Sequence, residues 1–419
     1  WTKEDETDRP EEGAVPVIRI PNIQDRLELG DLVYLRNISA DALEKAAVTK
    51  GWLLFIGSNG SQDRIGDSVL MEEDRAMVFA SFLMGMTVKD REELIPEFLA
   101  SWMRLHLVHE WFSKTSQQTT GLGNYSWGAV KKLPLRFPAD PDEQRRIAAA
   151  LKLADDAIAK AKAELEATRE LKRSLMTQVF ESGLAPSVNK KPYKIHRCYT
   201  ASIPAHWDTE PLGKSLVLVE YGTNAPSNDY QSGYPVIAIP QVVAPHLSLT
   251  DVPFAEVSET ESVALRLITD DVLLIRTNGN PEYIGKSTIV SEEVGATHTI
   301  FASYLIRLRT DKEKLLGAYL NYFLASPLGR RQAGAVANTS AGNNNIGARA
   351  IKQFKFPRPP VPEQEQIVGL LNGVETQINA LAGKVEALHQ VKKTLLQNLL
   401  TGKIRIPAEE QPNKEAVHG

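Results

Sequence analysis

The sequence has little cysteine and no long apolar run, and each shortage excludes a class of protein. Cys198 is the only cysteine among 419 residues, which excludes an internal disulfide and a zinc site with several cysteine ligands. No apolar run approaches the roughly 18–20 residues of a membrane helix. The first residues also lack the basic and apolar pattern of a signal peptide. We therefore expect a cytoplasmic protein.

A net positive charge is also lacking, because 52 Asp and Glu outnumber 48 Lys and Arg and give a formal net charge of −4. Modules that bind nucleic acid alone are usually basic. Any DNA binding would therefore need locally basic loops, or a partner that neutralises the phosphates. The length allows two or three domains, and 42% hydrophobic residues is typical of a globular chain.

Catalytic and metal-binding patterns are missing as well. Adenine methyltransferases carry a glycine-rich cofactor loop and an Asn/Asp-Pro-Pro-aromatic tetrapeptide, whereas Asn280-Pro281-Glu282-Tyr283 lacks the second proline. Gly285-Lys286-Ser287 resembles the end of a phosphate-binding loop, but the required upstream glycine is absent, and we interpret it as a turn and a strand. The eight histidines are scattered, without metal-ligand spacing. We predict a chain without catalytic residues, metal or cofactor of its own.

An internal repeat is the strongest positive signal. PVIRIP at 16–21 recurs as PVIAIP at 235–240, and Asn59-Gly60 recurs as Asn278-Gly279 at the same offset. Phe79-Ala80-Ser81 recurs as Phe301-Ala302-Ser303 at nearly that offset. Because the matches keep their order and nearly their spacing, we infer two copies of one unit.

Each copy has the same order of expected elements. Apolar runs at 52–56, 77–84, 272–276 and 301–308 predict buried strands. Helices are expected at about 92–113 and 312–333. The proline-rich segments LPLRFPADP and FKFPRPPVP then predict stiff extended connectors.

A long helix of about 40 residues follows each connector, with the alternating 4 and 3 spacing of a coiled-coil seam. Lys172 and Lys392 interrupt the seams, where Leu171 and Val391 are expected to take over the apolar side, and Gly183 and Gly402 end the helices. A single apolar stripe needs a partner. Parallel and antiparallel pairing are both possible, and we favour the antiparallel pair because it gives pseudo-twofold symmetry. The principal apolar seam residues are Ile147, Leu151, Ile158, Leu165, Leu175, Val179, Ile367, Leu371, Val374, Ile378, Leu381, Val385, Leu388, Leu395 and Leu399.

Uncharged hydrogen-bonding residues gather in the loops of both copies. Asn and Gln pair bidentately with adenine, Arg pairs with guanine, and Ser and Thr both donate and accept. The alternative is ordinary turn chemistry, which we favour for Asn59-Gly60 and Asn278-Gly279. The candidate DNA-binding residues are Ser58, Asn59, Ser61, Gln62, Arg64, Gln117, Thr119, Thr120, Asn124, Arg276, Asn278, Asn280, Thr339, Ser340, Asn343, Asn344 and Asn345.

The polar residues of the long helices have simpler interpretations. Glu143-Gln144 and Glu363-Gln364 lie in the first helical turn, where an acid suits the helix dipole. They need no function beyond starting a helix, although the nearby surface could also dock a partner. Arg145, Arg146, Lys172 and Arg173 are expected on solvated helix faces.

These residues resemble the specificity subunit of type I restriction-modification systems. The resemblance covers nearly the whole chain and is most specific in TSQQTTGLGNYSWGAVKKLPLRFP (115–138), PDEQRRIAAALKLADDAI (141–158) and ELKRSLMTQVF (170–180), with second-copy versions TSAGNNNIGARAIKQFKFPRPP and VPEQEQIVGLLNGVETQI. It implies two target recognition domains, each reading half of a bipartite asymmetric DNA site, on an antiparallel coiled coil. It also implies two methyltransferase subunits that use S-adenosylmethionine, and restriction/translocase subunits.

The expected fold is α+β, with two β-rich recognition domains and two long helices. We place recognition domain 1 at 1–138, helix 1 at 139–183, a linker at 184–206, recognition domain 2 at 207–359, helix 2 at 360–404 and a tail at 405–419. Trp207 and Pro211-Leu212-Gly213 suggest an opening strand whose counterpart in the first domain is missing. The alternative functions are a coiled-coil scaffold that binds only proteins and a fused enzyme-specificity chain, the latter disfavoured by the missing cofactor motifs.

Overall fold

The computed structural model describes residues 5–407, apart from 60–63, 106–107, 109, 112–116, 120–121, 125–126, 185–188, 197–198, 245–246 and 341–342. The chain forms two compact units. Unit 1 comprises residues 1–163 and 381–419, and unit 2 comprises residues 164–380. The long helices α5 (Pro141–Ser182) and α12 (Val361–Leu400) each contribute one end to each unit.

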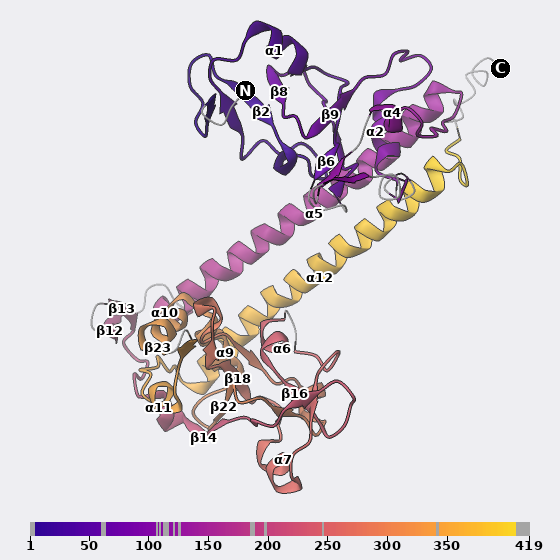
Figure 1. Cartoon of the computed structure of the whole chain (residues 1–419). Helices are drawn as coiled ribbons and strands as arrows, with labels where there is room; N and C mark the ends of the chain where they lie inside the picture. The colour runs from indigo at the N-terminus through magenta and orange to yellow at the C-terminus, as the bar shows by residue number, and fades with distance from the viewer. Residues whose placement is uncertain are drawn as a thin grey trace, which may run out of the picture. The chain divides into compact units, whose positions relative to one another are not determined.

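Unit 1 is built from three small sheets and short helices (Figure 1). The first sheet has the order β1 (Glu6–Thr7), β3 (Val33–Leu35), β2 (Val15–Ile18), β8 (Met77–Phe79), β4 (Ala47–Val48). The second is β7 (Ser68–Leu70), β5 (Leu53–Ile56), β9 (Leu83–Met86), and the third is β10 (Gln117–Thr119), β11 (Leu122–Asn124), β6 (Ser58–Asn59). The helical segments are η2 (Ile20–Asn22), α1 (Ala40–Ala46), α2 (Pro96–Met103) and α4 (Trp127–Val130).

Unit 2 repeats this plan with additions. One sheet has the strand order β14 (Leu216–Tyr221), β22 (Leu305–Thr310), β18 (Val272–Ile275), β20 (Ser287–Ile289). Another has the order β15 (Ser227–Asn228), β17 (Phe254–Ala255), β16 (Tyr234–Ile237), β21 (Ile300–Phe301). A further sheet has the order β19 (Thr277–Asn278), β24 (Asn343–Asn345), β23 (Asn338–Ser340). A hairpin joins β12 (Lys190–His196) and β13 (Tyr199–Pro204). The helical segments are η4 (Leu212–Ser215), α6 (Ile239–Val243), α7 (Glu259–Leu265), η5 (Pro281–Tyr283), α8 (Glu292–Gly295), α9 (Gly317–Ala325), α10 (Pro327–Val336) and α11 (Ala348–Lys352).

Strand pairing shows the same duplication as the sequence. In each unit the strand that contains the PVI repeat pairs in parallel with the strand that ends at the Phe of the Phe-Ala-Ser repeat. In unit 1 these strands are β2 and β8, and in unit 2 they are β16 and β21. The all-buried strands β5 and β18 are each central, between two antiparallel neighbours. In unit 2 the strand β14 adds to β22, whereas among the described residues of unit 1 no strand pairs with the far side of β9.

Several boundaries differ from the sequence prediction. The run 77–84 contains the strand β8, a turn and the first half of β9. The run 301–308 likewise contains the end of β21 and most of β22. The predicted helix near 312–333 is two helices, α9 and α10, because Ser326 caps the second one just before Pro327. The predicted opening strand at 211–213 is replaced by η4, and β14 follows it.

The predicted linker at 184–206 contains the β12–β13 hairpin, which packs into the core. Tyr193, Ile203 and the following Trp207 are buried together with Phe180 of α5 and Phe356 of the proline-rich connector. The connector is therefore more than a spacer, since its aromatic side chains fill the core of unit 2.

The first turn of each long helix is fixed by a buried glutamine. Gln144 Oε1 accepts a hydrogen bond of 2.9 Å from the backbone N–H of Ile95, which precedes α2. Gln364 Oε1 accepts one of 2.9 Å from Leu316, which precedes α9. Each amide nitrogen donates 2.8–2.9 Å bonds to two backbone carbonyls. The interpretation that Glu-Gln needs no function beyond starting a helix is wrong for the glutamine, because it also ties that helix to the backbone before α2 or α9.

The two long helices run antiparallel where they meet within each unit. In unit 1 the buried Ile147 and Leu151 near the start of α5 share a core with Leu399 near the end of α12. In unit 2 Val179 near the end of α5 shares a core with Ile367 and Leu371 at the start of α12. All the predicted seam residues are buried or partly buried.

The seam lysines form ion pairs with acids of the opposite helix. Lys172 pairs with Glu375 in unit 2, and Lys392 Nζ lies 2.5 Å from Asp155 in unit 1. The expectation that Leu171 and Val391 replace them in the seam is wrong, because these two side chains are 55% and 51% exposed. Lys172 is also not on a solvated face, whereas Arg145 and Arg173 are largely exposed. Both helices end at a glycine with positive φ, Gly183 and Gly402.

Candidate nucleic-acid interface

Each unit brings its two polar loops together in a three-stranded ribbon. In unit 1, β6 pairs with β11, which pairs with β10, so Asn59 lies opposite Gly123 although the two are distant in sequence. In unit 2, β19 pairs with β24, which pairs with β23, so Asn278 lies opposite Asn344. We name these the unit 1 ribbon and the unit 2 ribbon.

The ribbons contain most of the predicted DNA-binding residues. The unit 1 ribbon carries Ser58, Asn59, Gln117, Thr119 and Asn124. The unit 2 ribbon carries Asn278, Thr339, Ser340, Asn343, Asn344 and Asn345. Ser61, Gln62 and Thr120 lie outside the described residues. Sequence reasoning selected these residues by composition, and the strand pairing brings them to one place in each unit.

The asparagines before and inside the 278–283 loop form turns. Asn278 Oδ1 accepts a 2.8 Å bond from the N–H of Asn280, and Asn280 Oδ1 accepts a 2.9 Å bond from Glu282, which caps η5. This is the turn chemistry of asparagine. It shapes the loop at the end of the ribbon, and the side-chain amide nitrogen Nδ2 of each asparagine takes no part in these two bonds.

The two candidate arginines are held by their own unit. Arg64 donates to Asp67 at 3.1 Å and to the carbonyl of Ile23. Arg276 donates a 3.0 Å bond to the carbonyl of Ser303, and its guanidinium lies 4.6 Å from the ring centre of Tyr221. These contacts position both arginines and occupy part of their hydrogen-bonding capacity.

Tyr221 is a residue of this region that sequence reasoning missed. Its hydroxyl accepts a 2.9 Å bond from the N–H of Ala348 at the start of α11, while its ring contacts Arg276. It therefore joins both ends of the unit 2 ribbon, because Arg276 precedes β19 and Ala348 follows β24. No motif marks it, since both of its partners are distant in sequence.

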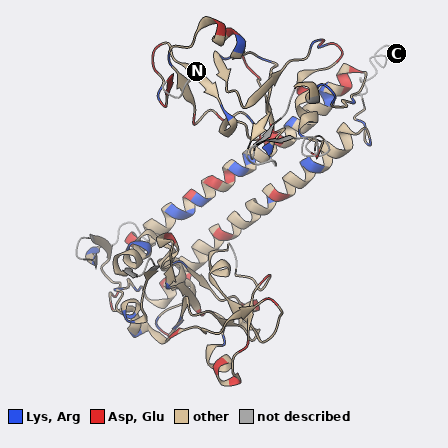
Figure 2. Ribbon diagram, in the orientation of Figure 1, with Lys and Arg blue, Asp and Glu red and all other residues tan. Residues whose placement is uncertain are grey.

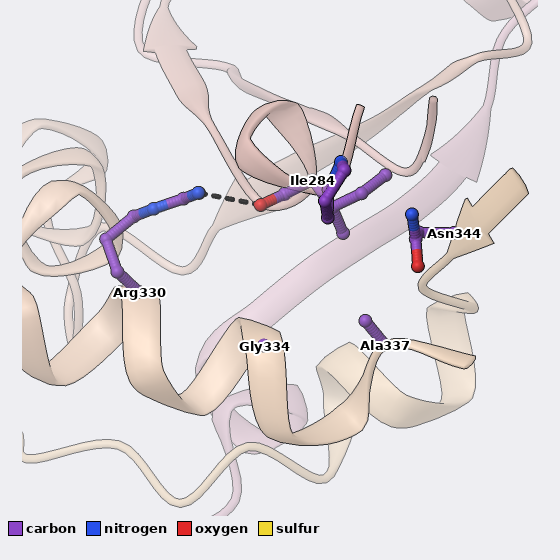
Figure 3. Close-up of a pocket in the computed structure, with 6 residues that line it drawn as sticks. Ile284, Arg330, Gly334, Ala337 and Asn344 are labelled. Carbon is purple, nitrogen blue, oxygen red and sulfur yellow. Dashed lines mark hydrogen bonds between the residues drawn. The ribbon is translucent and has the colours of Figure 1, made fainter. Parts of the chain in front are cut away.

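A hollow of about 260 Å³ adjoins the unit 2 ribbon. Figure 3 shows Arg330 of α10 reaching the backbone beside Ile284, with Gly334, Ala337 and Asn344 around the same space. Arg330 donates to the carbonyls of Ile284 at 2.7 Å and Glu282 at 2.8 Å. Burial lowers the pKa of Arg330, which remains cationic at neutral pH. The arginine therefore fixes the 282–284 loop to α10.

Basic residues flank the ribbons in both units. Arg349 and Lys352 lie on α11, directly after the unit 2 ribbon, and Lys131 and Lys132 follow α4 after the unit 1 ribbon. All four are exposed. Figure 2 shows acidic residues of unit 2 on α7, among other places. The four exposed cations follow the ribbons in the sequence and carry the charge that attracts phosphates, although the chain as a whole is net negative.

Within the part of the chain that the structure describes, no group of three or more His, Cys, Asp or Glu could hold a metal ion. In the same described residues, no helix combines the length and apolar character that a membrane span requires.

Comparison with known proteins points to one family. The chain is 25% identical to the type I restriction enzyme EcoKI specificity subunit of Escherichia coli, over 93% of this chain and 83% of the relative. It is 21% identical to the StySPI specificity subunit of Salmonella potsdam, with the same coverage. A protein of Methanocaldococcus jannaschii, provisionally described as the MjaX specificity subunit, is 28% identical, but the match spans about half of each chain, 48% here and 46% there. No family model matches.

Solved structures give the same fold. A chain from a study of assembly and conformational transition of the type I restriction-modification system has a TM-score of 0.57 at 15% identity, covering 93% of this chain and 92% of that one. The type I S subunit of M. genitalium has a TM-score of 0.55 at 14% identity, covering 95% and 91%. The resemblance of this sequence to type I specificity subunits is confirmed.

Proposed function

We propose that this chain, similar over most of its length to type I restriction enzyme specificity subunits, is the DNA sequence-recognition subunit of such a complex. The observation that carries the proposal is the ribbon. Each unit gathers uncharged hydrogen-bonding residues from distant loops onto one small sheet, next to exposed lysines or arginines. The proposed DNA target is a bipartite asymmetric site, with one half read by each unit.

The chemistry of the ribbons suits reading base edges. The major groove admits a β-ribbon, and Asn or Gln side chains pair bidentately with adenine there. The unit 2 ribbon contains three consecutive asparagines at 343–345, whereas the unit 1 ribbon contains Gln117, Gln118 and Thr119 at β10. Two ribbons with different donors and acceptors would read two different half-sites, so the site would be asymmetric.

The proposed scaffold is an antiparallel coiled coil of α5 and α12 with pseudo-twofold symmetry. The ion pairs Lys172–Glu375 and Asp155–Lys392 support one register. The α5 residues of the two ion pairs, 155 and 172, are separated by the same number of residues as the α12 residues, 375 and 392. The order is reversed, because the earlier α5 residue pairs with the later α12 residue. Two local contacts in separate units thus agree with one continuous antiparallel pairing.

The proposed partners supply the chemistry. Two methyltransferase subunits that bind S-adenosylmethionine would dock on this chain and methylate adenines, and restriction/translocase subunits would complete the complex. This chain itself would carry no cofactor and catalyse no step. A partner would also neutralise DNA phosphates, which accounts for a recognition subunit with a net charge of −4. We expect this assembly in the cytoplasm.

The test is methylome sequencing of cells that express the methyltransferase subunit with and without this chain. We expect one bipartite adenine-methylated motif that disappears when the chain is omitted. Purified alone, the chain should transfer no methyl group. An unchanged methylome would refute DNA reading and favour the alternative, a coiled-coil scaffold that binds only proteins.

A further inference from the structure

An exposed aromatic residue occupies the same position in both units. Phe79-Ala80-Ser81-Phe82-Leu83 recurs as Phe301-Ala302-Ser303-Tyr304-Leu305. In both copies the N–H of the leucine donates to the carbonyl of the alanine, at 2.9 Å and 3.0 Å, which forms the turn into the next strand. The leucines are buried, but Phe82 is 52% exposed and Tyr304 is 51% exposed.

The backbone of each aromatic residue is tied to the first strand of its ribbon. The carbonyl of Phe82 accepts hydrogen bonds from Gly57 at 3.0 Å and from Ser58, the first residue of β6, at 3.2 Å. The carbonyl of Tyr304 accepts a 2.9 Å bond from Arg276, the residue before β19. Each exposed ring therefore stands where the ribbon leaves the buried sheet, and the sheet holds its backbone in place.

Single exposed hydrophobic residues are common and need no explanation. One observation separates Phe82 and Tyr304 from that background. The aromatic character is retained in both copies, although the ribbon sequences beside them have diverged. By contrast, Tyr230 is 90% exposed but lies in the loop between β15 and β16, outside the duplicated Phe-Ala-Ser segment.

We propose that Phe82 and Tyr304 are specificity-determining DNA contacts, each packing its ring against the bases of the half-site that its own ribbon reads. The inference rests on the proposed DNA-reading function. Ribbon side chains supply hydrogen bonds, and the aromatic ring adds the apolar surface that they lack. Thymine methyl groups and the faces of unstacked bases are the apolar partners that DNA offers. In unit 2, Arg276 beside Tyr304 adds a positive charge for the neighbouring backbone phosphates.

The test compares Phe82→Ala and Tyr304→Ala in the chain assembled with its methyltransferase subunit, on duplexes that carry the methylated motif. Each substitution should weaken specific binding roughly tenfold, because an aromatic contact to a base contributes about that much. The dependence of Kd on salt should not change, because no phosphate contact is lost. In methylomes, Phe82→Ala should relax positions in one half-site and Tyr304→Ala positions in the other.

Three controls make the outcome decisive. Tyr230→Ala removes an even more exposed ring and should leave affinity and motif unchanged, and Tyr304→Phe should retain binding. Thermal unfolding of the alanine variants should match wild type, because the rings are half exposed.

If the wild-type complex binds its motif but both alanine variants bind within twofold of it, the inference is wrong. The same holds if they weaken assembly with the methyltransferase subunit instead. Failure of the wild-type complex to bind any motif would refute the proposed function itself.

Discussion

The buried glutamines Gln144 and Gln364 show how single side chains attach the β-rich part of a unit to a long helix. The amide oxygen of each glutamine accepts a hydrogen bond from the backbone N–H of the residue just before α2 or α9. Its amide nitrogen donates hydrogen bonds to two backbone carbonyls. Both are fully buried. Buried backbone groups must be paired, because an unpaired one costs roughly 1–3 kcal/mol. The glutamine therefore satisfies backbone groups of the domain and of the connector at once.

Replacing either glutamine by leucine should destabilise its unit. The side-chain volume is similar, but three hydrogen bonds are lost and buried backbone groups remain unpaired, so we expect a loss of about 2–4 kcal/mol. Urea unfolding of Gln144→Leu and Gln364→Leu measures this loss. Gln366→Leu is the matched control on an exposed face of α12 and should stay within about 0.5 kcal/mol of wild type. A core variant that unfolds like this control would contradict the bridging role.

At the level of elements, α5 and α12 form two ion pairs, Lys172–Glu375 and Lys392–Asp155, at lysine positions where the predicted seam would otherwise be apolar. Lys172 Nζ also lies 5.6 Å from the ring centre of Tyr322, and Asp155 accepts a 2.9 Å bond from Arg104 at the end of α2. A polar residue at a seam position specifies register at some cost in stability. The paired lysines are thus placed to align the helices and to orient the domains that contact them.

A charge exchange tests this alignment. Lys172→Glu should destabilise unit 2, because it places two carboxylates together in a partly buried site. The double variant Lys172→Glu/Glu375→Lys should recover part of that stability, with a coupling energy of about 1 kcal/mol in a double-mutant cycle. Arg173→Glu, on the exposed side of the same turn, should have little effect. Equal losses in the single and double variants would argue against the pair.

The sequence predicted these elements unevenly, for physical reasons. The periods of the long helices, their glycine ends and the all-buried strands are local patterns, so 53–56 and 272–275 were found directly. The ribbons could be predicted only as polar loops, because Asn59 and its partner strand β11 lie far apart in the sequence. The partners of Gln144, Lys172 and Tyr221 are also distant in sequence, and no local pattern encodes them.

At the level of the whole molecule, duplication with divergence gives two units of similar design and different ribbon chemistry. If each unit reads its own half-site, the units should be exchangeable. Replacing residues 200–355 by the matching segment of a related specificity subunit should change one half of the methylated motif and preserve the other. Methylome sequencing detects this directly. A change in both halves, or in neither, would contradict independent reading.

The same scaffold predicts that helix length sets the spacer between the half-sites. The midpoint of the two ion pairs falls just after Ala163 in α5 and just after Gly383 in α12, so insertions directly after these two residues are matched. Four residues added at both positions would lengthen each helix by about 6 Å and rotate it by about 400°, which is close to one full turn, so the seam nearly keeps its face. Since duplex DNA rises about 3.4 Å per base pair, the spacer should grow by one or two base pairs with both half-sites unchanged.

Two residues at both positions would rotate the seam by about 200° and separate the apolar faces, so that variant should lose activity. Methylome sequencing of both variants measures the spacer. An active four-residue variant with the original spacer would mean that the helices do not determine the distance between the half-sites.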